Sequence, residues 1–199
     1  MDTRGAIDAL AIGGVVALPT DTVYGIAASL RFPEAVAALF VLKRRPATLA
    51  LPVLVSSVDQ IESLGVVWDE RAGTLGRAFW PGALTIVVGV PQNLSDLVGS
   101  TTRTVGFRCP DDAMLRHVLE QSGPLALTSA NEHGEAPCES AVQVLRAFDD
   151  LDDLDGLDGV LDGGERSGRV STVVDVSGAT FRVVREGAIS EAALAAVLG

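Results

Sequence analysis

Basic, hydroxyl and amide side chains recur at the ends of the strands that this sequence predicts. In the stretch 104–109 the apolar residues alternate on one face, so Thr104 and Arg108 share the other. Ser129 and Asn131 share a face at the end of a later predicted strand. Donors of these types bind phosphate or carboxylate groups, so the pattern favours a site for an anionic substrate.

Two further strand ends carry groups of the same kind. Thr20 and Thr22 would share a face if the first predicted strand stays extended as far as "LPTDT". Arg185 is predicted on the same side of its strand as Phe181 and Val183, which alternate as core residues do. Each of these strand ends therefore places a polar or cationic group beside apolar neighbours.

A basic cluster follows the predicted helix 33–43. Lys43 continues the apolar stripe of that helix, so its ammonium is predicted to point along the buried face. Arg44 and Arg45 come directly after it. This cluster would add cations to the same anion site.

Each group also has an ordinary structural interpretation. Lys43 could complement the negative end of its helix. Arg108 or Arg185 could pair with one of the 26 acidic residues, and Ser129 and Asn131 could cap a helix or shape a turn. These interpretations do not explain why several such groups occur together on faces flanked by apolar residues.

Other candidates are weaker. The two cysteines and two histidines cannot supply a disulfide framework or a zinc quartet. Cys109 lies on the core face of its predicted strand, and His117 lies off the apolar stripe of its helix. His133 follows the Ser129–Asn131 strand end and could lie near a site. The acidic stretch 149–162 lacks the first ligand of a calcium loop and is predicted to be a solvated connection.

The elements that would position these groups alternate along the chain. About seven strands and several helices interleave, which indicates an α/β or α+β domain with a mixed, twisted sheet. There is no internal repeat and no linker, so residues 1–199 are predicted to form a single domain. Predicted helices are 3–12, 33–43, one starting at Ser57, 70–79, 112–121, 139–148 and 191–198, and predicted strands are 15–18, 51–55, 81–90, 104–109, 124–130, 171–176 and 180–184.

Composition argues against several classes of protein, including membrane proteins and nucleic-acid-binding proteins. Hydrophobic residues make up 48% of the 199 residues and charged residues 21%, as expected for a chain that folds around a core. The net charge of −11 argues against a broad nucleic-acid-binding face, and DNA is not an expected partner. No apolar run is long enough to span a membrane and no signal peptide is evident, so we expect a cytoplasmic protein.

The sequence resembles the YrdC-like family, the threonylcarbamoyl-AMP synthases. The resemblance covers nearly the whole chain, and its segments occur in the family's order. They are "PTDTVYG" (19–25), "LKRRP" (42–46), "LPVLVSS" (51–57), "WPGALTIVV" (80–88), "TVGFRCP" (104–110), "PLALTSAN" (124–131), "LDGG" (161–164), "STVVD" (171–175) and "REGAI" (185–189).

The resemblance implies an α/β fold with a twisted, open, mixed sheet and a large central cavity. It also implies an enzyme, a nucleotidyltransferase that makes threonylcarbamoyl-AMP and pyrophosphate from L-threonine, bicarbonate and ATP. The product would serve partner proteins that make threonylcarbamoyladenosine in tRNA. Mg²⁺ is expected to arrive with ATP, and no protein metal ligand is expected.

The resemblance also implies a role for particular residues. Thr22, Arg108 and Ser171 would hold threonine. Lys43 and Arg45 would be the catalytic residues. The residues expected to hold ATP are Lys43, Arg45, Thr104, Ser129, Asn131 and Arg185.

Two other functions remain to be weighed. One is a non-catalytic RNA-binding or ribosome-associated module on the same fold, against which the net charge counts. The other is a carbamoyl-transfer relative of the kind fused into hydrogenase-maturation proteins. The length of the chain and the absence of zinc-finger cysteines count against it.

Overall fold

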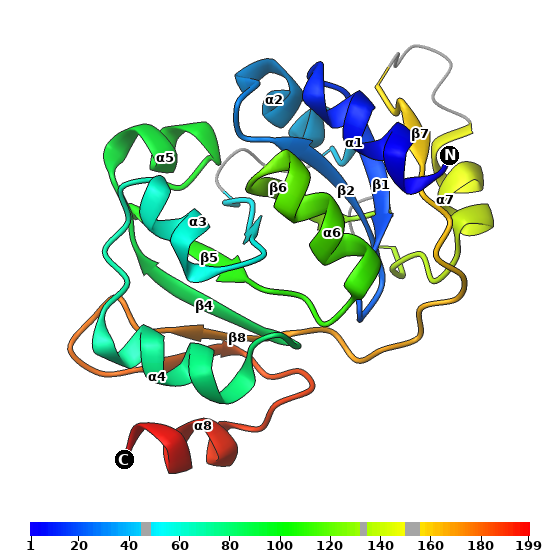
Figure 1. Cartoon of the computed structure of the whole chain (residues 1–199). Coiled ribbons are helices and arrows are strands. Elements are labelled where there is room, and N and C mark those ends of the chain that lie inside the picture. Colours follow the sequence, from blue (N-terminus) through cyan, green and yellow to red (C-terminus); the bar gives the residue numbers. More distant parts are fainter. Residues whose placement is uncertain (45–48, 132–134, 150–155) are drawn as a thin grey trace.

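Nine strands of the described residues form one mixed sheet (Figure 1). The structure is a computed structural model that describes residues 1–44, 49–131, 135–149 and 156–199. The strand order is β7-β1-β2-β6-β3-β5-β4-β8-β9, so the sheet is open, with β7 and β9 at its edges. The strands are β1 (Val15–Pro19), β2 (Tyr24–Ser29), β3 (Val53–Leu54), β4 (Leu84–Gly89), β5 (Thr104–Arg108), β6 (Leu125–Ser129), β7 (Gly159–Val160), β8 (Thr172–Asp175) and β9 (Arg182–Arg185).

Antiparallel and parallel pairs alternate irregularly across this sheet. The pairs β1–β2, β2–β6, β3–β6, β4–β5 and β8–β9 are antiparallel. The pairs β1–β7, β3–β5 and β4–β8 are parallel. The predicted α/β class with an open mixed sheet is confirmed.

Helices cover the two faces of the sheet unequally. They are α1 (Thr3–Ala11), α2 (Pro33–Leu42), α3 (Val58–Ser63), α4 (Glu70–Phe79), α5 (Gln92–Leu97), α6 (Ala113–Ser122), α7 (Ala141–Asp149) and α8 (Glu191–Leu198). The larger core cluster joins residues of α2, α3, α4, α5, α7 and α8 to one face. The smaller cluster, on the other face, takes helix residues only from α1 and α6 in the described parts of the chain.

Local sequence signals explain where several helices begin. Asp2, Asp69 and Asp112 each accept a hydrogen bond from the backbone N–H three residues later, at 2.8–2.9 Å. Pro33 starts α2, at a position where a backbone N–H would have no hydrogen-bond partner within the helix. These caps fix the helix starts, and burial of the apolar faces supplies most of the stability.

The unequal cover leaves part of the sheet for the site. On β5 and β4, Phe107 and Ile86 point into the larger core and are fully buried. The alternate residues Arg108 and Thr85 point to the opposite face and line a cavity. Because α1 and α6 pack over the β1–β2–β6 side of that face, the face of β5, β4 and β8 forms the floor of the cavity.

Three elements were not predicted. The strand β2 reads "YGIAAS", in which glycine, alanine and serine give a weak strand signal, yet all six residues are buried between β1 and β6. The short helix α5 and the two-residue strand β7 are too brief for a periodic pattern. Among the described residues no helix has the length and apolar character needed to cross a membrane.

Candidate functional site

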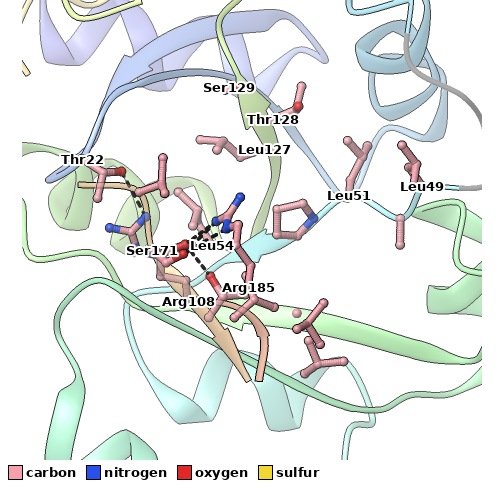
Figure 2. A pocket seen from close by; sticks show the side chains of 18 of the residues that line it. Thr22, Leu49, Leu51, Leu54, Arg108, Leu127, Thr128, Ser129, Ser171 and Arg185 are labelled. Atoms are coloured by element: carbon pink, nitrogen blue, oxygen red, sulfur yellow. Dashed lines mark hydrogen bonds between the residues drawn. The ribbon is translucent and has the colours of Figure 1, made fainter. Parts of the chain in front are cut away.

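A cavity of about 570 Å³ lies over the uncovered floor of the sheet, within the range of roughly 300–1,000 Å³ that ligand pockets occupy. Figure 2 shows how side chains from both halves of the sheet point into it. Of the residues predicted to form the site, six line the cavity: Thr22, Thr104, Arg108, Ser129, Ser171 and Arg185.

Arg108 stands at the end of β5, bonded on three sides. Its Nη2 donates to Asp21 Oδ1 at 2.6 Å, its Nη1 to Thr22 Oγ1 at 3.2 Å, and its Nε to the Gly82 carbonyl at 3.0 Å. The side chains of Arg108 and Asp21 are only 8% and 13% exposed, so this ion pair is largely removed from water. The pair therefore fixes the direction in which the guanidinium faces the cavity.

Thr20 and Thr22 lie together, although the strand does not reach them. β1 ends at Pro19, and the chain turns so that Thr20 Oγ1 accepts the backbone N–H groups of Thr22 and Val23. The two hydroxyl oxygens are 2.9 Å apart. The predicted proximity thus comes from a turn that threonine hydroxyls stabilise, rather than from strand alternation.

Arg185 reaches the cavity because of a β-bulge. The pairing of β8 with β9 shifts register between Val173 and Val174, so Val174 faces Val183 while Val173 faces Arg185. Val183 packs against the larger core, whereas Val173 and Arg185 line the cavity. The prediction that Arg185 lies on the same side as Val183 is wrong for this reason.

Ser171 is hydrogen-bonded to Arg185, and both residues lie near Arg108 in the cavity (Figure 2). The Nη2 of Arg185 donates to the Ser171 carbonyl at 2.9 Å and to Ser171 Oγ at 3.1 Å. Partial burial lowers the pKa of Arg185, and the positive charge of Arg108 lowers it further. The two guanidinium groups are thus close enough to repel each other.

The charges in this cluster do not balance. Asp21 pairs with Arg108, but in the described residues no carboxylate is bonded to Arg185. Glu186, next to it in the chain, forms no ion pair within the same residues. The cavity floor therefore carries an excess positive charge and hydroxyl donors, which suits an anion.

Lys43 is buried away from the cavity lining. It is 3% exposed, and its Nζ donates to Ser129 Oγ and the Ser129 carbonyl at 3.0 and 2.9 Å. The carbonyl and the Oδ1 of Asn131 are each 2.6 Å from the same nitrogen. Lys43 and Asn131 are not among the described residues that line the cavity. The predicted burial of Lys43 is confirmed, and its ammonium binds the end of β6.

Arg45 and His133 lie outside the described residues. Thr104 lines the cavity, and its Oγ1 lies 2.8 Å from Thr102 Oγ1. Ser129 also lines the cavity, with its hydroxyl held by Lys43.

The glycine-rich segment 162–172 packs over the "PTDTVYG" segment. The backbone N–H of Gly168 donates to the Thr22 carbonyl at 2.9 Å, and a Cβ at position 168 would lie 2.6 Å from the Asp21 carbonyl oxygen. Only glycine permits this approach. Tyr24 adds two bonds, since its hydroxyl accepts from the Gly163 N–H at 3.0 Å and donates to the Gly164 carbonyl at 2.9 Å. The segment thus holds Thr22 and also contains Ser171.

Neither cysteine is placed to act as a nucleophile. Both thiols are buried, and burial raises the pKa of Cys109 and of Cys138. Among the described residues, no three histidine, cysteine, aspartate or glutamate side chains gather as a metal site would require.

Thr85 lines the cavity and was not predicted. The alternation that identified Arg108 would have found it, because Ile86 and Val88 are buried in the larger core and leave Thr85 on the other face.

Comparisons with known protein families, sequences and structures show what this chain is similar to. The family model described as "Telomere recombination", which groups Sua5, YciO and YrdC, matches residues 8–187. A Mycobacterium tuberculosis protein provisionally named as a threonylcarbamoyl-AMP synthase is 39% identical over 195 residues, which are 98% of this chain and 88% of that protein. The threonylcarbamoyl-AMP synthase of Bacillus subtilis is 36% identical over 188 residues, covering 93% of this chain and 53% of its own length.

A solved structure is similar over almost the whole chain. The crystal structure of Pyrococcus abyssi Sua5 complexed with L-threonine superposes with a TM-score of 0.90 at 32% sequence identity. The match covers 99% of this chain and 57% of the other.

Proposed function

The chain belongs to the Sua5/YciO/YrdC family, and from this membership and the cavity we propose that it is a threonylcarbamoyl-AMP synthase. In this proposal it is a nucleotidyltransferase that converts L-threonine, bicarbonate and ATP into threonylcarbamoyl-AMP and pyrophosphate, with residues 1–199 acting as one domain. Relatives with the synthase name occur in bacteria, archaea and mammals, which does not favour the alternative of a non-catalytic RNA-binding module.

One observation carries the proposal. Three guanidinium groups, those of Arg108, Arg182 and Arg185, line one cavity together with many hydroxyl side chains. Only two carboxylates, Asp21 and Asp175, are paired with them, so one positive charge is left over among the described residues. The substrates are an amino acid with a carboxylate, bicarbonate and a polyphosphate, so each carries an anionic group. An excess of fixed positive charge and hydrogen-bond donors is what such a set of ligands needs.

The cavity offers a division of roles. Thr22, Arg108 and Ser171 would hold threonine. Thr22 and Arg108 are hydrogen-bonded to each other, and all three residues line the cavity. Thr104, Ser129 and Arg185 would contact ATP from the remaining walls. Lys43 would act on ATP by holding the Ser129 hydroxyl and the end of β6, with Asn131 as its partner. Arg45 is assigned to the phosphates by the family motif alone.

The chemistry requires positioning rather than a protein nucleophile. The threonine amine and bicarbonate give a carbamate and water. A carbamate oxygen then attacks the α-phosphorus of ATP, and the bond to the bridging oxygen breaks to release pyrophosphate. Fixed cations lower the barrier of such a step by stabilising charge on the phosphate oxygens. Mg²⁺ would enter bound to ATP.

We place the reaction in the cytoplasm, with partner proteins that transfer the threonylcarbamoyl group to tRNA as consumers of the product. A mixed anhydride of a carbamate and a phosphate is open to attack by water. An enzyme that uses it directly must therefore work close by.

The test is a turnover assay with purified protein, ATP, bicarbonate and labelled L-threonine. We expect pyrophosphate release that depends on threonine, and a labelled adenylate that requires bicarbonate. L-Valine, which keeps the shape of threonine without the hydroxyl, is the control substrate. Pyrophosphate release that does not depend on threonine, or tight tRNA binding with no turnover, would contradict the proposal.

A further inference from the structure

Thr85 has no role in the proposed division of residues, yet it lines the cavity and its hydroxyl contacts that of Ser171. The residue is 6% exposed, and its Oγ1 is 3.1 Å from Ser171 Oγ. That contact is its only side-chain hydrogen bond in the part of the chain that the structure describes. A hydroxyl can donate one hydrogen bond and accept others, and this single contact uses only one of these functions.

The position of the Thr85 hydroxyl is fixed by its neighbour on β5. A Cβ added to Gly106 would lie 2.7 Å from Thr85 Cγ2, so the methyl group of Thr85 occupies the space that the glycine leaves open. Threonine is branched at Cβ, so a fixed methyl also fixes the hydroxyl. With the methyl over Gly106, the hydroxyl faces Ser171.

A count of protons shows what the pair can do. A guanidinium can only donate, so Ser171 Oγ accepts from Arg185 Nη2 at 3.1 Å. The hydroxyls of Thr85 and Ser171 carry two protons between them. One proton is used in the bond that joins them, whichever residue donates it. The other has no acceptor in the described residues and is left for a ligand or water.

We propose that Thr85 and Ser171 form one hydrogen-bond donor, and that Thr85 is a positioning residue for the amino-acid substrate. The pair presents a single O–H to a carboxylate oxygen of threonine, beside the guanidinium of Arg108. Without the Thr85 hydroxyl, the Ser171 hydroxyl is free to rotate and its proton is no longer directed. This inference rests on the proposed function for the identity of the ligand.

The test measures L-threonine binding by calorimetry and steady-state kinetics with ATP varied. The variants are Thr85→Val, which keeps the shape and removes the hydroxyl, Thr85→Ser, Ser171→Ala and the double variant Thr85→Val/Ser171→Ala. Thr74→Val, on the outer helix α4, makes the same chemical change away from the cavity. Thermal melting of each variant checks that it is folded.

We expect Thr85→Val to weaken threonine binding about tenfold, the effect of one directed hydrogen bond, with the KM for ATP unchanged. Thr85→Ser, which keeps the hydroxyl but loses the methyl that fixes it, should bind threonine with an affinity between those of Thr85→Val and wild type. Thr74→Val should bind within about twofold of wild type. Since the two hydroxyls act as one donor, removing both should cost little more than removing one. The threonine affinity of the double variant should therefore be within about twofold of that of Ser171→Ala.

Three results would overturn the inference. They are threonine binding by Thr85→Val at the wild-type level, full additivity in the double variant, and a loss of ATP affinity equal to the loss of threonine affinity. Wild-type protein that binds no threonine would also overturn it. Wild-type protein that binds threonine but releases no pyrophosphate would refute the proposed function and leave this inference standing.

Discussion

Arg108 and Lys43 mark two ends of the site, and they are used in opposite ways. Arg108 lines the cavity while it is bonded to Asp21, Thr22 and the Gly82 carbonyl. Lys43 lies under the end of β6, where four oxygens of Ser129 and Asn131 surround its nitrogen at 2.6–3.0 Å. One cation faces the ligand space, and the other holds the strand that borders it.

The difference follows from the shapes of the two side chains. A guanidinium has five N–H donors in a fixed plane, so it can serve protein acceptors and a ligand at the same time. An ammonium has three donors, and the oxygens around Lys43 already outnumber them. Arginine can therefore be oriented by the protein and still act on a substrate, whereas this lysine acts by orienting others.

The largest effect should come from Arg108→Met. We expect threonine-dependent pyrophosphate release to fall at least about 100-fold, because a preorganised cation is lost. The free energy of unfolding should fall by about 3 kcal/mol, because Asp21 is left buried without its partner. Turnover and urea unfolding measure the two effects. The double variant Arg108→Met/Asp21→Asn should recover most of the stability and none of the activity; recovery of both would show that Arg108 is only structural.

Lys43→Met should change stability and ATP binding together. Four acceptors lose the ammonium, and the two bonds to Asn131 are fully buried, so we expect the free energy of unfolding to fall by roughly 1–3 kcal/mol. The KM for ATP should rise while threonine binding stays within about twofold of wild type. Calorimetry with threonine and kinetics with ATP separate the two. An equal loss of affinity for ATP and for threonine would contradict the different roles assigned to Arg108 and Lys43.

Arg185→Ala should affect ATP more than threonine. We expect the KM for ATP to rise about tenfold, because one charge-assisted contact is lost. The melting temperature should hardly move, since in the described residues this side chain bonds only to Ser171. Arg77→Ala, an exposed arginine on α4, is the matched control. A rise in the threonine KM instead would reverse the assignment of the two ends.

The smallest effect should appear at a cysteine. Burial raises the pKa of Cys138, and the positive charge of Lys43 lowers it in part. In Lys43→Met the pKa of Cys138 should therefore rise further, so the pH midpoint of its alkylation by iodoacetamide moves upward. Lys43 is not among the charges that act on Cys109, whose midpoint should stay where it is. Peptide mass spectrometry resolves the two thiols.

The sequence was sufficient to predict the site where a strand is regular. Alternation along β5 separates Arg108 from the buried Phe107, because a side chain changes face at every residue of a regular strand. The same rule failed at Arg185, because the bulge opposite Val173 and Val174 inserts a residue and reverses the face. A bulge has no sequence signature strong enough to be seen in one chain.

Long-range contacts account for the rest of what the sequence could not reveal. The apolar stripe of α2 predicted that Lys43 is buried, but its acceptors lie 86 and 88 residues further along the chain. The strand β2 was missed because its burial comes from β1 and β6 on either side, not from its own residues. A domain with a mixed sheet was predictable from the succession of helices and strands, and the open form of the sheet was implied by the family resemblance.

The bond between Tyr24 and the 162–172 segment gives the protein a natural optical reporter. Tyr24 is the only tyrosine in the chain, and its hydroxyl contacts Gly163 and Gly164. Burial raises the pKa of this phenol. Ionisation of a phenol increases ultraviolet absorbance near 295 nm, so a single chromophore reports whether the segment is seated. The native protein should titrate at higher pH than the urea-unfolded chain, and any ligand that tightens the segment over Thr22 should move the midpoint higher still.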